Sequence, residues 1–353
     1  MSRREERRPS RPTQADIARL AGVSQPTVSL VLGGNKAGVA LSGETRQRVL
    51  DAARSLGYVP DPIARRLSRR TNNLLGLYTF TATFPTDVQH SYYPFLVGVE
   101  EEAAAQGYDL LLFTSSSSTE AGASEVLNRV RLADGCLFLG RHVPEQAMSR
   151  FLDDGYPLVY IGRHDELGER LPYVGADYVS ASADVVRRLA ELGHRHLAYV
   201  REKDDAPASA DREAGLRSAV AGTGMRAEVV RTDGADVDAV RLRSWLSGGV
   251  TAIVAEETDT DLAVTAVESA ARAAGLRCPD DFSLALLGDR VGRSPGLPAL
   301  SGFAIPRREM GRAAVRMLTG LIAGEPDVRI RRILGCQPLA GETVGAPPAT
   351  GTH

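Results

Sequence analysis

The sequence predicts a small all-α head that contains a helix-turn-helix, followed by an α/β body of two lobes with doubly wound parallel sheets. Two short helical patterns lie back to back around Gly22 in the segment QADIARLAGVSQPTVSLVL. From Leu74 onward, short apolar runs alternate with amphipathic stretches, and this alternation occurs in two successive series. Such alternation is typical of parallel sheets covered by helices, and a chain of 353 residues is long enough for several domains.

The composition is that of a globular protein, with 43% apolar and 24% charged residues. No apolar run approaches the roughly 18 residues that a membrane-spanning helix needs. The arginine-rich start also lacks the apolar segment of a secretory signal. We therefore expect a cytoplasmic protein without membrane contact. The cysteines Cys136, Cys278 and Cys336 are scattered and show no metal-binding spacing, so we expect neither a metal nor a cofactor.

The net charge of −2 hides an asymmetry along the chain. Residues 1–70 contain 14 basic and 6 acidic residues, a balance of +8, so the remaining residues carry −10. A basic head on an acidic body favours contact between the head and a polyanion such as nucleic acid. Residues 1–11 by themselves are better explained as a disordered basic tail than as a segment that contacts nucleic acid.

Helix signals in the head are closely spaced. Thr13 is a suitable N-cap, and Asp16 stands three positions later, as in a capping box. Gly22 ends this helix, Ser24 caps the next one, and Pro26 falls in its first turn, where a missing N–H has little effect. Short helices joined by a tight glycine turn predict a helix-turn-helix, whose second helix enters the major groove.

The predicted recognition helix has a polar outer face. Gln25 can read a base edge, and the hydroxyl groups can hold phosphates. Ser42 can cap a third helix that ends at Gly57. The residues expected to be exposed on the recognition helix are Gln25, Pro26, Thr27, Ser29 and Leu30.

The segment YVPDPIARRLSRR, residues 58–70, predicts a short fourth helix, with Asp61 as cap and Pro62 at its first position. A helix of two turns is marginal in water unless something docks it. Leu67 lies among arginines, a pattern that suits a wedge in a DNA minor groove. A plain basic linker explains the same residues, and the segment alone does not decide between the two.

In the body, the apolar runs predict buried parallel strands in two series. Ligands of such sheets bind beyond the carboxyl ends of the strands, which places a site in the cleft between two lobes. The predicted strands cover residues 74–80, 109–115, 135–140 and 157–162 in the first series, and 196–201, 251–257 and 282–288 in the second.

The segments TQADIARLAGVSQPTVSLVL and LSGETRQRVLDAARSLGYVPDPIARRL resemble the DNA-binding head of the LacI/GalR family of bacterial transcriptional regulators. The resemblance implies a hinge helix that folds on DNA and inserts Leu67 at the operator centre. It also implies homodimers on a palindromic operator and a repressor function. Leu30 departs from the arginine that most members carry there. The DNA-binding residues that the resemblance and the helix pattern imply are Thr13, Ser24, Gln25, Pro26, Thr27, Ser29, Leu30, Ser42, Thr45, Tyr58, Ala64, Arg65 and Leu67.

The body also has family counterparts, in LPYVGADY, ELGHRHLAYV and IPRREMGRAAVRMLTGLI, and such bodies resemble periplasmic sugar-binding proteins. The resemblance implies an effector that stacks on an aromatic ring and hydrogen-bonds to carboxylates and guanidinium groups, most often a sugar. The segment EETDTDLAV lacks the family's Asn-Asp pair, so a nucleobase corepressor, or no effector, stays an alternative. The implied effector residues are Tyr92, Ser115, Arg163, Asp177, Arg212 and Asp289.

No nucleotide-binding loop, metalloprotease motif or nucleophile elbow occurs, so we expect no enzyme. A solute-binding protein is a more remote alternative. The predicted domains are a tail (1–11), a helix-turn-helix domain (12–59), a hinge helix or linker (60–73) and a core (74–345). Within the core, the N-lobe takes residues 74–177 and 305–328, and the C-lobe takes residues 178–304 and 329–345.

Overall fold

A computed structural model describes residues 12–33, 41–58, 72–79, 91–113, 129–141, 145–164, 167–290 and 298–348. The chain divides into two compact units, residues 1–72 and residues 73–353. Among the described residues, no helix combines the length and the apolar character needed to cross a membrane.

The regular elements that the structure describes in the first unit are the helices α1 (Gln14–Ala21), α2 (Gln25–Leu32) and α3 (Gly43–Ser55). Their apolar faces meet in one small core, in which Ile17, Val28 and Val49 are completely buried. The predicted capping box of α1 is confirmed, because the Thr13 side chain accepts from the Asp16 N–H while the Asp16 carboxylate accepts from the Thr13 N–H. The predicted helix-turn-helix is therefore present.

The N-lobe of the second unit is built on a parallel sheet in the order β11-β5-β4-β3-β1-β2. The strands of this sheet in chain order are β1 (Leu74–Thr79), β2 (Asp109–Phe113), β3 (Gly135–Leu139), β4 (Leu158–Ile161), β5 (Tyr173–Ala176) and β11 (Arg331–Leu334). The helices of this lobe are α5 (Tyr93–Ala105), α7 (Glu145–Asp153) and α12 (Arg307–Ala323), with short 3-10 turns at Val130–Leu132 and Gly168–Arg170.

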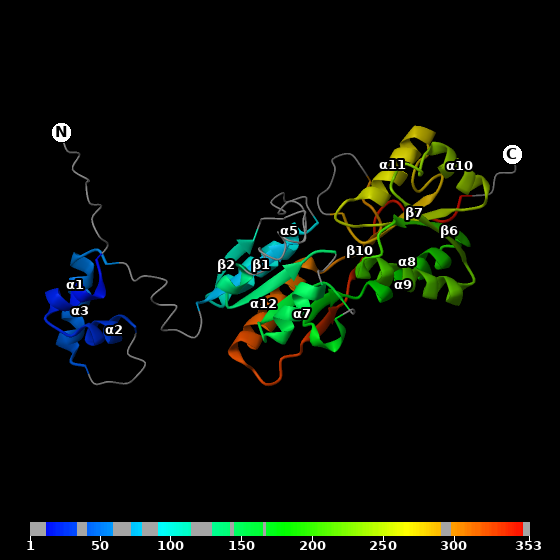
Figure 1. The fold of residues 1–353 in the computed structure, drawn as a ribbon. Helices are drawn as coiled ribbons and strands as arrows, with labels where there is room; N and C mark the ends of the chain where they lie inside the picture. The colour runs from blue at the N-terminus through cyan, green and yellow to red at the C-terminus, as the bar shows by residue number, and fades with distance from the viewer. Residues whose placement is uncertain are drawn as a thin grey trace, which may run out of the picture. The chain divides into compact units, whose positions relative to one another are not determined.

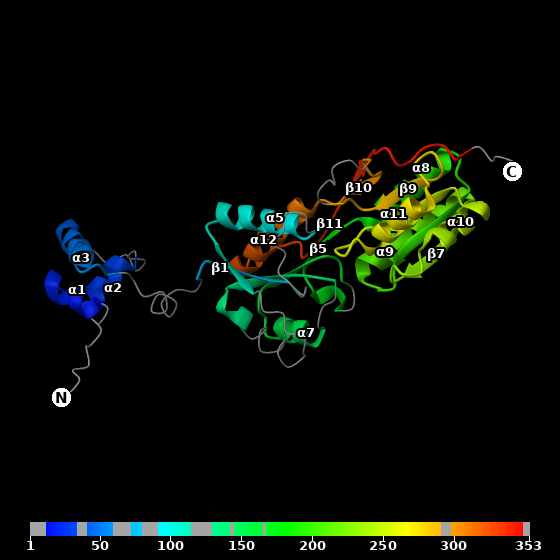
Figure 2. The ribbon, with the colours of Figure 1, turned by 90° about the horizontal axis from the view of Figure 1, so that it is seen from above.

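The C-lobe repeats the pattern with a parallel sheet in the order β7-β6-β8-β9. Its strands are β6 (His196–Glu202), β7 (Arg226–Thr232), β8 (Ala252–Glu256) and β9 (Ser283–Leu287), and its helices are α8 (Tyr178–Glu191), α9 (Pro207–Thr223), α10 (Ala239–Ser247) and α11 (Leu262–Ala274). The antiparallel pair β10 (Gly302–Ala304) and β12 (Gln337–Leu339) adjoins β9 through the bridge from Ala285 to Ser301. Figures 1 and 2 show the two lobes of this unit side by side.

One predicted boundary is wrong. We expected residues 329–345 in the C-lobe, but within this range β11 pairs with β5 in the N-lobe sheet, with Arg331 opposite Tyr173 and Leu334 opposite Ala176. This pairing gives the otherwise open edge of β5 a hydrogen-bonded neighbour. In the described part of the chain, the backbone therefore passes between the lobes three times, after β5, before α12 and after β11.

Helices α5 and α12 pack closely across the N-lobe although they are about 200 residues apart in sequence (Figure 2). A Cβ atom on Gly98 would lie only 1.9 Å from the carbonyl oxygen of Arg308, so the two backbones touch where no side chain intervenes. Beside this crossing, hydrogen bonds from Arg308 and Arg312 lower the pKa of Glu101 to about 2. The crossing thus fixes α5 and α12, which both pack on strands of the N-lobe sheet, against each other.

Gly98→Ala is expected to destabilise the second unit by about 1–3 kcal/mol, because the added methyl group overlaps the α12 backbone. Gly222→Ala is the matched control, since a Cβ on this α9 residue meets nothing within 4 Å. The control should be neutral or slightly stabilising, as alanine favours a helix over glycine. Urea unfolding followed by circular dichroism measures both, and equal effects would refute the close crossing.

Candidate functional site

The outward face of α2 is polar and accessible. Gly22 adopts a left-handed conformation (φ 65°) that ends α1, and Ser24 then caps α2 by accepting from the Thr27 N–H at 3.3 Å. Gln25 and Ser29 are exposed, while Val28 and Val31 face the core. Thr27 and Leu30 of the predicted set are half-buried, whereas Pro26 is exposed. The helix can therefore enter a groove with its polar face leading.

Hydroxyl groups stand at the N-termini of all three helices that the structure describes in this unit. Thr13 caps α1, Ser24 caps α2, and Ser42 caps α3 by accepting from the Thr45 N–H at 3.1 Å. Helix N-termini with hydroxyl groups are suited to phosphate contact. Tyr58 packs against the core of this unit. The predicted hinge residues Ala64, Arg65 and Leu67 lie outside the described residues.

The second unit contains a cavity of about 100 Å³ between its lobes. It lies where β3 and β4 of the N-lobe and β8 of the C-lobe end, because Gly140, Gly162 and Glu257 line it. The side chains around it that carry polar or aromatic chemistry are Ser91, Tyr92, Phe95, Arg141, Tyr160, Arg163, Tyr178, Ser209, Arg212, Glu257, Thr258, Asp259 and Arg307.

Arginines of the N-lobe bind carboxylates of the C-lobe across this cavity. Arg141, which follows β3, lies 2.9 Å from Glu202, 3.0 Å from Asp204 and 3.3 Å from Asp259. Arg163, which follows β4, makes a two-pronged ion pair with Asp211 of α9. We call these contacts, with the Arg307–Asp289 pair described next, the interlobe clasp.

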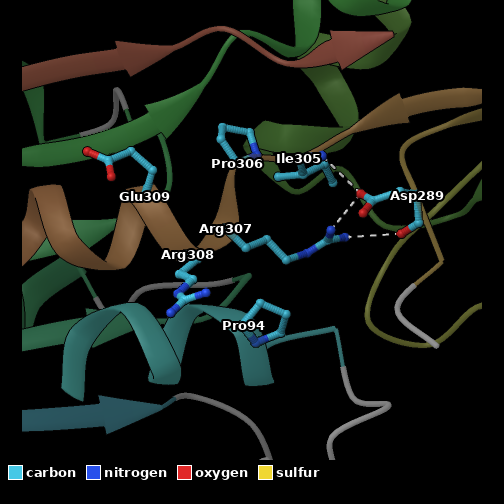
Figure 3. A pocket seen from close by; sticks show the side chains of 7 residues that line it. All are labelled: Pro94, Asp289, Ile305, Pro306, Arg307, Arg308 and Glu309. Atoms are coloured by element: carbon cyan, nitrogen blue, oxygen red, sulfur yellow. Dashed lines mark hydrogen bonds and ion pairs between the residues drawn. The ribbon is translucent and has the colours of Figure 1, made fainter. Parts of the chain in front are cut away.

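The third part of the clasp connects the start of α12 with the end of β9. Arg307 reaches the Asp289 carboxylate at 2.5 Å, and the same oxygen accepts from the Ile305 N–H at 3.0 Å (Figure 3). The side chain of Arg307 is 6% exposed and that of Asp289 22%, so the arginine is shielded from water and the carboxylate partly so. These contacts form part of a second pocket that also includes Pro94 of α5.

Arg212 is buried, and most of its guanidinium group already makes contacts within the protein. Its guanidinium lies 4.0 Å from the centre of the Tyr178 ring, and its Nε donates to the Leu287 carbonyl at 2.7 Å. Its Nη1 lies 4.0 Å from the Glu256 carboxylate. Only part of the guanidinium can therefore serve a ligand.

Aromatic rings provide the apolar part of the cavity. Tyr92 packs edge-on against Phe95, with 6.1 Å between the ring centres. Burial raises the pKa of Tyr92 and of Tyr160, so both phenols stay protonated at neutral pH. Such rings offer stacking faces to a ligand.

Comparison with known proteins identifies both units. Residues 13–61 match the model of "Bacterial regulatory proteins, lacI family", and residues 186–344 match the periplasmic binding protein-like domain. The regulator CelR of Thermobifida fusca is 30% identical over 334 residues, which cover 92% of this chain and 96% of CelR. The chain belongs to the LacI family. It is a DNA-binding transcriptional regulator.

Solved structures of LacI-family regulators show the same fold. The CelR–cellobiose complex is 26% identical, with a TM-score of 0.65, and the match covers 95% of this chain and all of that one. The lac repressor dimer bound to operator is 18% identical, with a TM-score of 0.74 over 96% of this chain and all of that one. In sequence, an uncharacterized regulator of Streptomyces limosus is 33% identical to this chain, and the match covers 89% of both chains.

In this LacI-family regulator, the structure brings Tyr92, Arg163 and Arg212 of the predicted effector residues to one cavity. Asp177 instead caps α8 by accepting from the Ser180 N–H at 2.9 Å, and it does not line the cavity. Asp289 lies in the adjacent pocket, while Ser115 falls outside the described residues. The roles of all these residues toward an effector stay predictions.

Sequence reasoning missed several cavity residues of this regulator, among them Arg141, Tyr160, Glu257 and Asp259. Arg141 directly follows the predicted strand 135–140, Glu257 ends the predicted strand 251–257 and Asp259 lies two residues beyond it, so the carboxyl ends of the predicted strands carried the signal for all three. In the described parts of the chain, no group of histidine, cysteine and acidic side chains could hold a metal ion.

Arg141→Gln is expected to destabilise the second unit by about 1–3 kcal/mol at pH 7, because it leaves half-buried carboxylates without their cation. Burial opposes ionisation of Glu202, but hydrogen bonds from Thr258 and Thr260 and the charge of Arg141 lower its pKa below the usual 4.5. Its contribution is therefore present above pH 4.5 and lost as the pH falls further. The loss caused by Arg141→Gln should shrink accordingly at pH 3.

Urea unfolding at the two pH values measures this difference. Arg170→Gln is the control, because its ion pair with Asp153 is more than half exposed on both sides and should contribute less than about 1 kcal/mol. An equal loss for both variants would show that the contacts of Arg141 across the cavity add nothing to stability.

Proposed function

We propose that this protein is a repressor that binds a palindromic operator as a homodimer, and that a sugar or sugar derivative in the interlobe cavity controls its DNA affinity. The observation that carries the effector part is the cavity itself, at the carboxyl ends of strands from both lobes, where aromatic rings face polar side chains. Rings stack on sugar faces, and carboxyl and guanidinium groups bond to hydroxyl groups. The similarity to CelR, which has been solved with cellobiose, supports the same ligand class.

The size of the cavity supports a coupling between ligand and lobe movement. About 100 Å³ is less than the roughly 300–1,000 Å³ of common ligand sites, so a disaccharide requires the lobes to separate. Separation stretches the interlobe clasp, because each of its arginines contacts the opposite lobe. A ligand that binds one lobe arrangement better than the other shifts the population between them and thereby changes DNA affinity.

On the DNA side, Gln25 is proposed to read a base edge from the exposed face of α2. Leu67, with Ala64 and Arg65, is proposed to act as the minor-groove wedge. The proposed backbone contacts come from Thr13, Ser24, Thr27, Ser29, Ser42, Thr45 and Tyr58, and Pro26 and Leu30 are proposed to pack against the groove.

Gln25→Ala is expected to weaken specific operator binding about 5- to 100-fold, which corresponds to about 1–3 kcal/mol for one base contact. Binding to random DNA should hardly change, because phosphate contacts dominate it. Gln47→Ala is the matched control, since Gln47 is exposed on α3 and bonds to Asp51. Fluorescence anisotropy with both DNAs measures the effect, and equal losses on operator and random DNA would contradict a base-reading role.

The whole proposal is tested by anisotropy on the DNA upstream of the protein's own gene, across a salt series. We expect tight, salt-dependent binding that cellobiose or another neutral sugar changes at least tenfold. If guanine or hypoxanthine changes binding and sugars do not, the effector is a nucleobase. If the protein binds this DNA tightly but no compound changes the affinity, the effector part of the proposal is wrong while the DNA-binding part stands. Sedimentation of the protein–DNA complex tests the dimer.

A further inference from the structure

Glu257 is a buried carboxyl group in the cavity that the contacts described above leave unused. It follows β8, is 1% exposed and lines the cavity, and its Oε2 has no hydrogen-bond partner among the described residues. Its stem packs against Gly288, where a Cβ would lie only 2.7 Å from the Glu257 Cβ. The side chain is thus fixed in place with one oxygen unsatisfied, which is unfavourable unless a ligand or water completes it.

The charges around Glu257 favour its neutral form. Asp261, on the same loop, is a second acidic group beside it. The two arginines nearby already form ion pairs with other carboxylates, Arg290 with Glu268 at 3.2 Å and Arg307 with Asp289. Burial, followed by the hydrogen bond with Asp261 and its charge, raises the pKa of Glu257 to about 9. The group is therefore protonated at pH 7, with its O–H directed to Asp261 and its other oxygen left as an acceptor.

We propose that Glu257 presents a neutral carboxyl group to a hydroxyl group of the effector, in a cavity whose surrounding carboxylates favour an uncharged ligand over sugar acids and sugar phosphates. This inference rests on the proposed function, because it concerns the same cavity. A ligand hydroxyl can donate to the oxygen of Glu257 that has no partner, and this contact satisfies the part of the carboxyl group that Asp261 leaves open.

An acidic ligand meets an unfavourable charge balance. The arginines of the cavity and clasp are Arg141, Arg163, Arg212 and Arg307, and the carboxylates that neutralise them are Glu202, Asp204, Asp211, Glu256, Asp259 and Asp289. The carboxylates outnumber the guanidinium groups even when Glu257 is neutral. A buried anion would have to displace one of these partners and leave it unpaired.

The protonation state is tested first, without ligand, by the melting temperatures of the wild type and Glu257→Gln between pH 5 and pH 8.5. An acid whose pKa is raised on folding loses stability as the pH rises from its unfolded value toward its folded one, whereas glutamine does not. The melting temperature of the variant relative to that of the wild type should therefore rise by about 4 °C or more between pH 5 and pH 8.5. Glu191→Gln is the control, because Glu191 is 67% exposed on α8. A pH-independent difference for Glu257→Gln would overturn the proposal.

The ligand choice is tested by calorimetry with cellobiose, glucuronate and glucose 6-phosphate at pH 6 and pH 8. We expect cellobiose alone to bind, with an affinity independent of pH. The cellobiose affinity of Glu257→Gln should stay within about threefold of the wild type, whereas that of Glu257→Ala should fall at least tenfold. Tighter binding of glucuronate or glucose 6-phosphate overturns the inference, as does unchanged cellobiose binding by Glu257→Ala, and both leave the effector part of the proposed function standing. Binding of none of the three, together with DNA binding that no sugar changes, removes that effector part, and the inference with it.

Discussion

The contact of Arg141 with three carboxylates of the opposite lobe is the constraint on which the arrangement of the second unit depends. The guanidinium is planar and carries enough donors for several acceptors at once. Glu202 in turn accepts from Thr258 and Thr260, so the clasp extends into the loop that follows β8. These charge pairs therefore add to the apolar cluster shared by the two lobes in fixing the spacing between the lobes, and with it the size of the cavity.

Much of the architecture follows from local signals in the sequence. The capping residues Thr13, Ser24 and Ser42 predicted where three helices begin, because a cap acts on the next three residues only. The apolar runs predicted strands β1, β4 and β9 for the same local reason. The position of β11 could not be predicted in this way, since Arg331–Leu334 has no continuous apolar run and owes its place to pairing with β5.

The candidate cavity was less predictable than the fold. Tyr92, Arg163 and Arg212 came from a family resemblance, which transfers positions but not the contacts made in this chain. Asp177 shows the difference, because its carboxylate serves the helix that begins beside it. Glu257 was overlooked because its character depends on burial and on packing against Gly288, which only the folded chain brings against it, as well as on Asp261 of the same loop.

Three backbone passages join the lobes, and they keep the arginines and carboxylates of the interlobe clasp close to one another. Tethered groups meet at an effective concentration set by their linkers, which lies in the millimolar range or above for short ones. Each of these linkers is a few residues long, so a broken clasp contact reforms as a unimolecular step. The balance between open and closed lobes is therefore independent of protein concentration in the cell.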